Sequence, residues 1–105
     1  MMYEKSYPKQ RFNITMDFLN QHISKNDRIL DLGVENPLSQ LMKTEGYNVV
    51  NTSGEDLDDD QTILKQTDYE VLTAFEIFEH LLNPYTVLKS CKAKKIVVSV
   101  PLRLW

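Results

Sequence analysis

Four short apolar runs constrain the fold of this chain most strongly, because none of them alternates cleanly between apolar and polar residues. Half-exposed strands show that alternation, whereas parallel strands covered on both faces read as continuous apolar segments. Helical or polar connections separate the runs, as in an open α/β sheet with right-handed crossovers. We therefore expect parallel strands with a ligand crevice at their carboxyl ends, over residues 28–32, 47–51, 69–75 and 96–100.

Apolar spacing and helix-start signals predict the first two helices. An amphipathic stripe indicates a helix over residues 9–25, within an N-terminal helical lead-in of residues 1–26. A second helix is expected to start at Asn36 and Pro37, because asparagine can cap free N–H groups and proline loses no needed donor there. Gly46 is placed to end that helix. The expected inward-facing residues are Phe12, Met16, Leu19 and Ile23 in the first helix, and Leu38, Leu41 and Met42 in the second.

The later connections consist of one polar segment and one further helix. Residues 52–60 are too polar and acidic for a core, and we expect a surface connection with a short strand around residues 55–57. Asn83 and Pro84 repeat the earlier helix-start signal. The expected inner face of the helix that follows is Val87, Leu88 and Cys91.

Length and composition limit the classes of protein to consider. A chain of 105 residues forms a single small domain, and its formal charge of −3 does not suit a general nucleic-acid binder. The one cysteine, Cys91, excludes an internal disulfide and a CxxC zinc site, and it suits a reducing compartment. No segment resembles a signal peptide or reaches the ~20 apolar residues of a membrane span. We expect a cytoplasmic protein with no membrane partner.

Four segments follow one another in an order that one enzyme family shares. They are the first strand with its glycine, the second strand, the Phe-Glu-Ile-Phe-Glu-His-Leu-Leu-Asn-Pro stretch, and the last strand with its exit, over residues 28–33, 46–50, 75–84 and 98–103. Together they resemble class I S-adenosylmethionine-dependent methyltransferases of types 11 and 12. The resemblance implies a Rossmann-like sheet, S-adenosylmethionine as cofactor and a small-molecule methyl acceptor, and it assigns no catalytic residue.

The same resemblance implies a cofactor site after the first two strands. Asp31 would accept hydrogen bonds from the amino group of the cofactor or orient the loop, and Gly33 would let the backbone approach the ligand. Ser53 aligns with the acid that binds ribose in the family, so Glu55 or Asp56 would replace that acid, with Leu57 against the adenine. The complete expected set is Asp31, Gly33, Val34, Glu35, Ser53, Glu55, Asp56, Leu57 and Phe75.

The loop after Gly33 departs from the family pattern. Two further glycines are usual there, whereas this chain has Val34, Glu35, Asn36 and Pro37. The Glu35 side chain would crowd the methionine part of the cofactor or contact its ammonium group. A non-catalytic, methyltransferase-like binding module is therefore the alternative to an enzyme.

A second alternative is a metal-assisted O-methyltransferase. Glu76, Glu79 and His80 would share one helical face, because offsets of three and four are neighbours on a helix. They resemble the ligands of metal-dependent methyltransferases, which implies Mg²⁺ or Mn²⁺. In the competing interpretation, His80 simply caps a helix or bonds to a loop.

The last apolar run, residues 96–100, lies close to the end of the sequence. We expect it to form an apolar sheet edge, and such edges pair with other strands. The 105 residues are then a fragment of a larger domain, or they form a homodimer or exchange strands through this edge.

Overall fold

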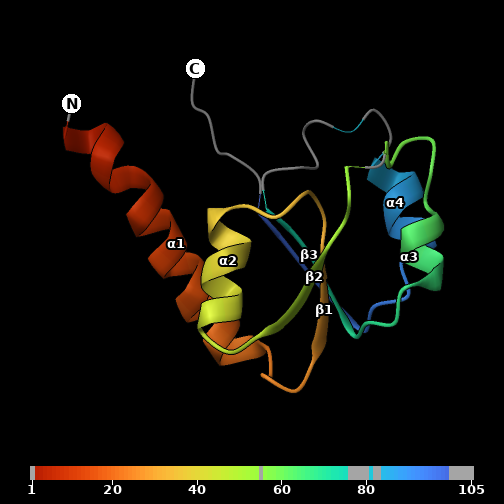
Figure 1. The fold of residues 1–105 in the computed structure, drawn as a ribbon, viewed down its shortest axis with the longest axis horizontal. Helices are drawn as coiled ribbons and strands as arrows, with labels where there is room; N and C mark the ends of the chain where they lie inside the picture. The colour runs from red at the N-terminus through yellow and green to blue at the C-terminus, as the bar shows by residue number, and fades with distance from the viewer. Residues whose placement is uncertain (1, 55, 76–80, 82–83, 100–105) are drawn as a thin grey trace.

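A four-stranded parallel sheet forms the centre of the fold, in a computed structural model that describes residues 2–54, 56–75, 81 and 84–99. Every neighbouring pair of strands is parallel. The open α/β sheet predicted from the apolar runs is confirmed. The strands are β1 (Arg28–Asp31), β2 (Asn48–Asn51), β3 (Val71–Phe75) and β4 (Lys95–Ser99), in the order β2-β1-β3-β4 (Figure 1).

The order of the strands reverses between β1 and β3. The chain places β2 on one side of β1 and then crosses to β3 and β4 on the other side. Ligands of open α/β sheets bind outside the carboxyl ends of the strands at such a switch point. The pairing register sets Asp31 of β1 beside Asn51 of β2 and Thr73 of β3. One row across the sheet therefore carries a carboxylate, an amide and a hydroxyl.

Arg28 holds the opposite end of the β1–β3 pair. Its N–H donates to Glu70 Oε1 over 3.0 Å, and its carbonyl accepts from the N–H of Glu70 over 2.8 Å. The Arg28 guanidinium also pairs with the carboxylates of Glu70 and Asp68. A shift of register by one residue would break these contacts and turn every side chain of the strand to the other face.

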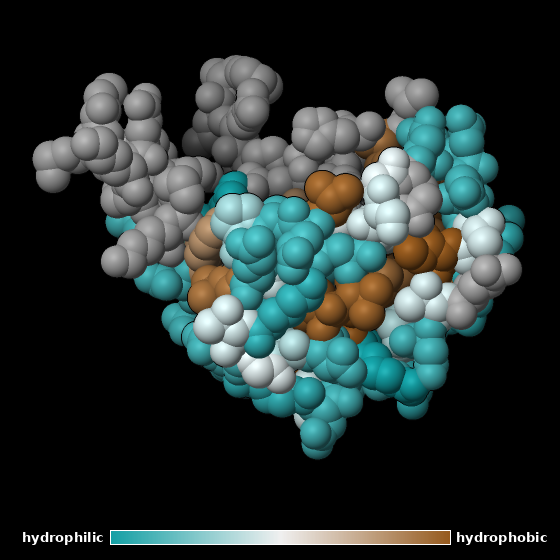
Figure 2. Space-filling model, viewed as in Figure 1, coloured by the Kyte–Doolittle hydropathy of each residue, from teal (hydrophilic) through white to brown (hydrophobic). Residues whose placement is uncertain are grey.

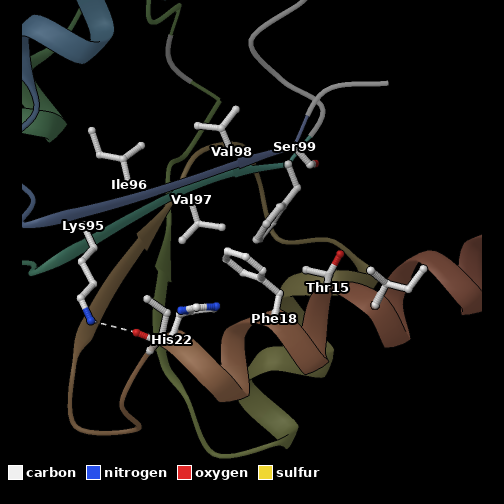
Figure 3. A pocket seen from close by; sticks show the side chains of 11 residues that line it. Thr15, Phe18, His22, Lys95, Ile96, Val97, Val98 and Ser99 are labelled. Carbon is white, nitrogen blue, oxygen red and sulfur yellow. Dashed lines mark hydrogen bonds between the residues drawn. The ribbon is translucent and has the colours of Figure 1, made fainter. Parts of the chain in front are cut away.

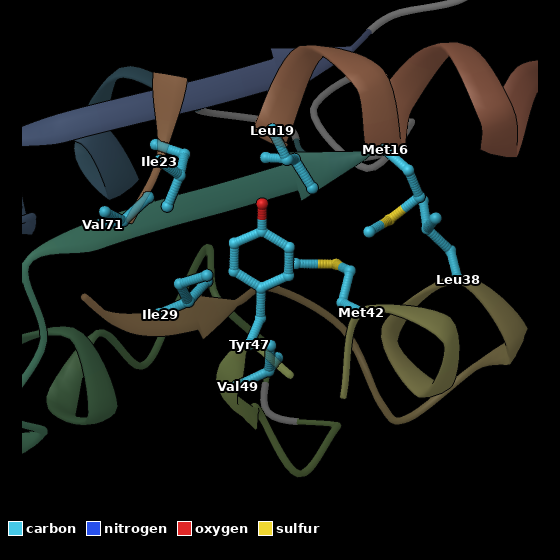
Figure 4. Packing of buried hydrophobic residues seen from close by; sticks show 9 residues of the cluster. All are labelled: Met16, Leu19, Ile23, Ile29, Leu38, Met42, Tyr47, Val49 and Val71. Atoms are coloured by element: carbon cyan, nitrogen blue, oxygen red, sulfur yellow. The ribbon is translucent and has the colours of Figure 1, made fainter. Parts of the chain in front are cut away.

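Two hydrophobic clusters cover the two faces of the sheet. Neighbouring strand residues point to opposite faces, so Ile29 joins the first cluster and Leu30 the second. Tyr47 lies in the middle of the first cluster (Figure 4). Its hydroxyl donates to Asn20 Oδ1 over 2.6 Å. The helices on the first side are α1 (Met2–His22) and α2 (Pro37–Thr44), and those on the second are α3 (Thr62–Gln66) and α4 (Pro84–Ser90).

Burial on both faces holds only for the two central strands. The edge strands leave Val50 of β2 and Ile96 and Val98 of β4 exposed, at 50%, 43% and 39%. Hydrophobic side chains also gather in the middle of the face seen in Figure 2, between the two helical layers. The expectation that the strands are buried on both faces is therefore wrong for the edge strands β2 and β4. The short helices on the side of the second cluster do not reach across these two strands.

The first helix differs from its predicted bounds. It runs over Met2–His22 instead of residues 9–25, and it ends early because a turn follows. In that turn the N–H of Ser24 donates to Asp27 Oδ2 over 3.0 Å, and the N–H of Asn26 donates to Ser24 Oγ over 3.1 Å. Such side-chain bonds compete with helix continuation. Among the described residues, no helix has both the length and the apolar character that a membrane span requires.

The second helix begins and ends as predicted. Asn36 Oδ1 accepts from the N–H groups of Leu38 and Ser39, both over 3.0 Å, and Pro37 is the first helical residue. Gly46 follows the helix with a φ of +100°, a conformation that favours glycine. The inner face of α2 consists of buried Leu38, Ser39 and Met42 with partly buried Leu41.

The segment after β2 corrects the prediction of a short strand around residues 55–57. Residues 57–59 form a turn, in which Asp56 Oδ1 accepts from the N–H of Asp58 over 3.1 Å. The helix α3 follows this turn and was not predicted, because its five residues are too few for a clear apolar period. In α4, Val87 is buried as expected, but Leu88 is exposed. Cys91 lies beyond the last turn of the helix, and it packs partly buried against the second hydrophobic cluster, as expected for an inward-facing residue.

We predict that Leu30→Ala destabilises the fold far more than Val50→Ala. Leu30 is fully buried between two layers, whereas Val50 is half exposed on the edge strand. A cavity in a core of this kind costs about 2–5 kcal/mol, while an exposed truncation changes stability by about 0.5 kcal/mol. Urea unfolding of both variants measures the difference. Equal losses in the free energy of unfolding would contradict the two-sided burial of β1.

Candidate functional site

A cavity of about 300 Å³ opens at the carboxyl end of β1, beside the start of α2. Its volume is at the lower end of the ~300–1,000 Å³ typical of small-molecule sites. It lies on the α1 and α2 side of the switch point between β1 and β3. The residues that line it are Arg11, Phe12, Asp31, Leu32, Asn36, Pro37, Leu38 and Phe75.

Asp31 is the buried polar group of this cavity, with 3% of its surface exposed. The Thr73 hydroxyl donates to Asp31 Oδ1 over 2.6 Å, and the Asn51 amide donates to Asp31 Oδ2 over 3.0 Å. Burial raises the pKa of Asp31 to about 6, although the two hydrogen bonds and the charge of Lys43 act in the opposite direction. A carboxylate in such surroundings favours a positively charged partner.

The loop after β1 is held by the end of β2. Gly33 has a φ of +107°, and its N–H donates to Thr52 Oγ1 over 2.7 Å. Its carbonyl accepts from Asn51 Nδ2 over 3.1 Å. Asn51 Oδ1 is buried, and none of the described residues offers it a hydrogen bond.

The N-terminus of α2 caps itself. Pro37 has no N–H, and Asn36 Oδ1 accepts from both Leu38 and Ser39. The N–H of Asn36 in turn donates to Ser39 Oγ over 2.9 Å. Phosphate sites at helix N-termini need free N–H groups that point at the ligand. These groups are already used here, so this end of the cavity is not built for a phosphate.

Val34 and Glu35, expected to contact the cofactor, do not line the cavity. Val34 is exposed, and Glu35 forms a surface ion pair with Lys43 over 2.7 Å. We expected the Glu35 side chain to crowd the cofactor or contact its ammonium group. Instead, it points to the surface and leaves the space beside Asp31 open.

The expected site residues after β2 lie apart from the cavity as well. Ser53 and Asp56 are exposed, and Asp56 caps the turn before α3. Leu57 is 3% exposed and packs in the second hydrophobic cluster, so it offers no free face to an adenine ring. Glu55 lies outside the described residues.

Of the expected set, Asp31 and Phe75 line the cavity, and Gly33 directly follows Leu32 of its wall. The expected metal ligands Glu76, Glu79 and His80 lie outside the described residues. Within the part of the chain that the structure describes, no group of three acidic, histidine or cysteine side chains is arranged to hold a metal ion.

Sequence reasoning missed Asn51, Thr52 and Thr73, which hold Asp31 and the Gly33 loop. Their roles depend on which residues face each other across the sheet, and the register is not visible in one chain segment. The observed register sets Asp31 beside the Asn51 amide and the Thr73 hydroxyl. Aligning the last residues of the predicted strands would have set Leu32 there instead, because the predicted first and third strands extend beyond the paired residues. Arg11 was missed because it lies far from the strand ends in sequence.

A second, larger groove of about 560 Å³ lies between α1 and the edge strand β4. Phe18, His22 and Val97 point toward one another there, and the rings of Phe18 and His22 have centroids 4.4 Å apart (Figure 3). Lys95 Nζ donates to the carbonyl of His22 over 2.9 Å at one end. The groove is mostly apolar and holds no buried carboxylate among its lining residues.

Comparison of the chain with protein-family models, curated proteins and solved structures finds no match. The geometry around Asp31 is therefore the basis for a functional proposal.

We predict that Asp31 makes stability depend on pH between about 4 and 6. Its pKa rises from 3.8 to about 6 on folding, so the folded state binds the proton more tightly in that window. The free energy of unfolding then falls as pH rises through the window, by about 1–3 kcal/mol, and is constant above it. Urea unfolding at several pH values compares the wild type with Asp31→Asn, which lacks this dependence. Parallel curves for the two proteins would contradict the prediction.

Proposed function

We propose that the chain is an S-adenosylmethionine-dependent methyltransferase, or the cofactor-binding part of one, acting on a small molecule. The observation that carries the proposal is the buried Asp31 carboxylate in a cavity at the switch point of a parallel sheet. This is the position where α/β sheets bind nucleotide-like ligands. When bound, the cofactor would supply an electrophilic methyl group on a positively charged sulfur.

The charges around the cavity favour this cofactor over dinucleotides. Asp31 would attract the ammonium group of an amino acid moiety, while Arg11 brings a positive charge to the same cavity for its carboxylate. The self-capped start of α2 offers no free N–H groups to a pyrophosphate. Phe12, Leu32 and Phe75 supply the apolar walls.

A non-catalytic binding module is the second candidate, because the loop after Gly33 carries side chains instead of glycines. The metal-assisted alternative rests on Glu76, Glu79 and His80, outside the described residues, and adding Mg²⁺ or Mn²⁺ to the binding experiment below tests it. The single cysteine, Cys91, is unpaired, which suits the cytoplasmic location that we propose.

We predict that S-adenosylhomocysteine binds the full chain in calorimetric titration with a dissociation constant below the millimolar range. Asp31→Asn should weaken binding at least about tenfold, because it removes the buried charge. Asp17→Asn is the matched control, since Asp17 is an exposed carboxylate of α1 that lines neither cavity. Nicotinamide adenine dinucleotide should not bind. If a folded sample does not bind S-adenosylhomocysteine, the proposal is wrong. If the chain binds the ligand but transfers no methyl group to any nucleophile, the non-catalytic module is favoured.

We also propose that two copies pair antiparallel through β4, the edge strand that exposes Ile96 and Val98. Pairing centred on Val97 sets Ile96 opposite Val98 of the second copy and Lys95 opposite Ser99. This register opposes apolar residues to each other and puts no like charges together. The occupant that suits the edge best is therefore a second copy of the chain.

Sedimentation at high micromolar concentration tests this pairing. The wild type should sediment as a dimer, and Val98→Lys should be monomeric because lysine on an edge opposes strand pairing. Val50→Lys changes an exposed valine on the other edge strand and should stay dimeric. A monomeric wild type would contradict the proposal.

A further inference from the structure

The Asn51 side chain joins two parts of the candidate site that belong to different segments. It is the last residue of β2, and its Nδ2 donates to Asp31 Oδ2 over 3.0 Å and to the carbonyl of Gly33 over 3.1 Å. An amide nitrogen has two hydrogens, so both donors are used. Asn51 Oδ1 accepts nothing from the described residues although it is buried.

The unpaired oxygen indicates which way the amide must point. If the amide were turned over, Oδ1 would face the carboxylate of Asp31 and the carbonyl of Gly33, and three acceptors would meet without a hydrogen. The observed orientation instead suits an ionised Asp31. Burial of an unpaired oxygen is unfavourable, so the two donated bonds are what hold the amide in this orientation.

The residue that directly follows β2 also holds the backbone N–H of Gly33. The N–H of Gly33 donates to Thr52 Oγ1 over 2.7 Å, next to the carbonyl that Asn51 holds. Both polar backbone groups of Gly33 are therefore fixed by two consecutive residues, Asn51 at the end of β2 and Thr52 directly after it. The Thr73 hydroxyl of β3, in contrast, donates to the Asp31 carboxylate and not to Gly33.

We propose that Asn51 is the positioning residue of this site: its amide joins the Asp31 carboxylate and the Gly33 loop into one unit that moves together. The consequence for ligand binding rests on the proposed function, whereas the unit itself exists in the free protein. Loss of the Asn51 amide should disturb both the Asp31 carboxylate and the Gly33 loop. Loss of the Thr73 hydroxyl should disturb the Asp31 carboxylate alone.

The charged groups around Asp31 set the background for its titration. Lys43 of α2 acts on it and lowers its pKa, and Glu35 is paired with that lysine. Arg11 of α1 lines the same cavity. The facing residues of β2 and β3, Asn51 and Thr73, do not titrate. A cation bound beside Asp31 should thus bind more tightly as pH rises through about 6, where the carboxyl ionises.

Nuclear magnetic resonance of the free protein tests the proposal without any ligand. The readouts are the pH midpoint of the Asp31 carboxyl carbon and the hydrogen exchange rate of the Gly33 N–H. Asn51→Ala should raise the midpoint by ~0.5–1 pH unit and speed the exchange about tenfold. Thr73→Val, which keeps the side-chain shape, should raise the midpoint and leave the exchange unchanged. Asn48→Ala, an exposed asparagine at the other end of β2, should change neither.

The result that overturns the proposal is an Asn51→Ala variant that matches Asn48→Ala in both readouts. If Asn51→Ala does not fold, Asn51→Ser gives the same test, because its hydroxyl can reach at most one of the two acceptors. Where the wild type binds S-adenosylhomocysteine, Asn51→Ala should also bind about tenfold more weakly. A wild type that binds nothing defeats the proposed function, and the two ligand-free readouts still decide the role of Asn51.

Discussion

The pairing of β1 with β2 on one side and β3 on the other is the constraint on which the rest of the molecule depends. It sets Ile29 and Leu30 into opposite hydrophobic clusters, so that each helical layer packs against the same two central strands. Its register is fixed at one end by Arg28 with Glu70, and at the other by Asp31 with Thr73. The interactions that stabilise the sheet thus also bring the polar groups of the site together.

The site differs from a phosphate-binding site although it occupies the same place in an α/β sheet. Helix α2 starts at the cavity, but Asn36 and Ser39 use its first N–H groups within the chain. The wall also carries Arg11 and the buried Asp31 carboxylate, whose pKa is raised. This combination suits a zwitterionic ligand with apolar parts. The loop after Gly33 leaves the cavity open because Val34 is exposed and Glu35 is paired with Lys43 at the surface.

The sequence predicted the elements that depend on neighbouring residues and missed those that depend on distant ones. The strands, the capped start of α2 at Asn36 and its end at Gly46 follow from local patterns, and all are confirmed. Helix α3 was missed because it is short, and Leu57 was assigned to a ligand although it packs in the core. Asp31 could be singled out as a buried acid at a strand end, but its partners Asn51 and Thr73 come from two other strands.

The most direct test asks whether S-adenosylmethionine binds in the cavity beside Asp31. Nuclear magnetic resonance measures which backbone amide signals of the isotopically labelled chain shift when S-adenosylmethionine is added. The cavity beside Asp31 and the groove between α1 and β4 are lined by different strand ends, with Phe75 common to both. Shifts should concentrate at Leu32, Gly33 and Leu38, at pH values above about 6 where Asp31 is ionised. Shifts confined to Ile14, Phe18 and Val97, or no shifts at all, would contradict the assignment of the cofactor to the Asp31 cavity.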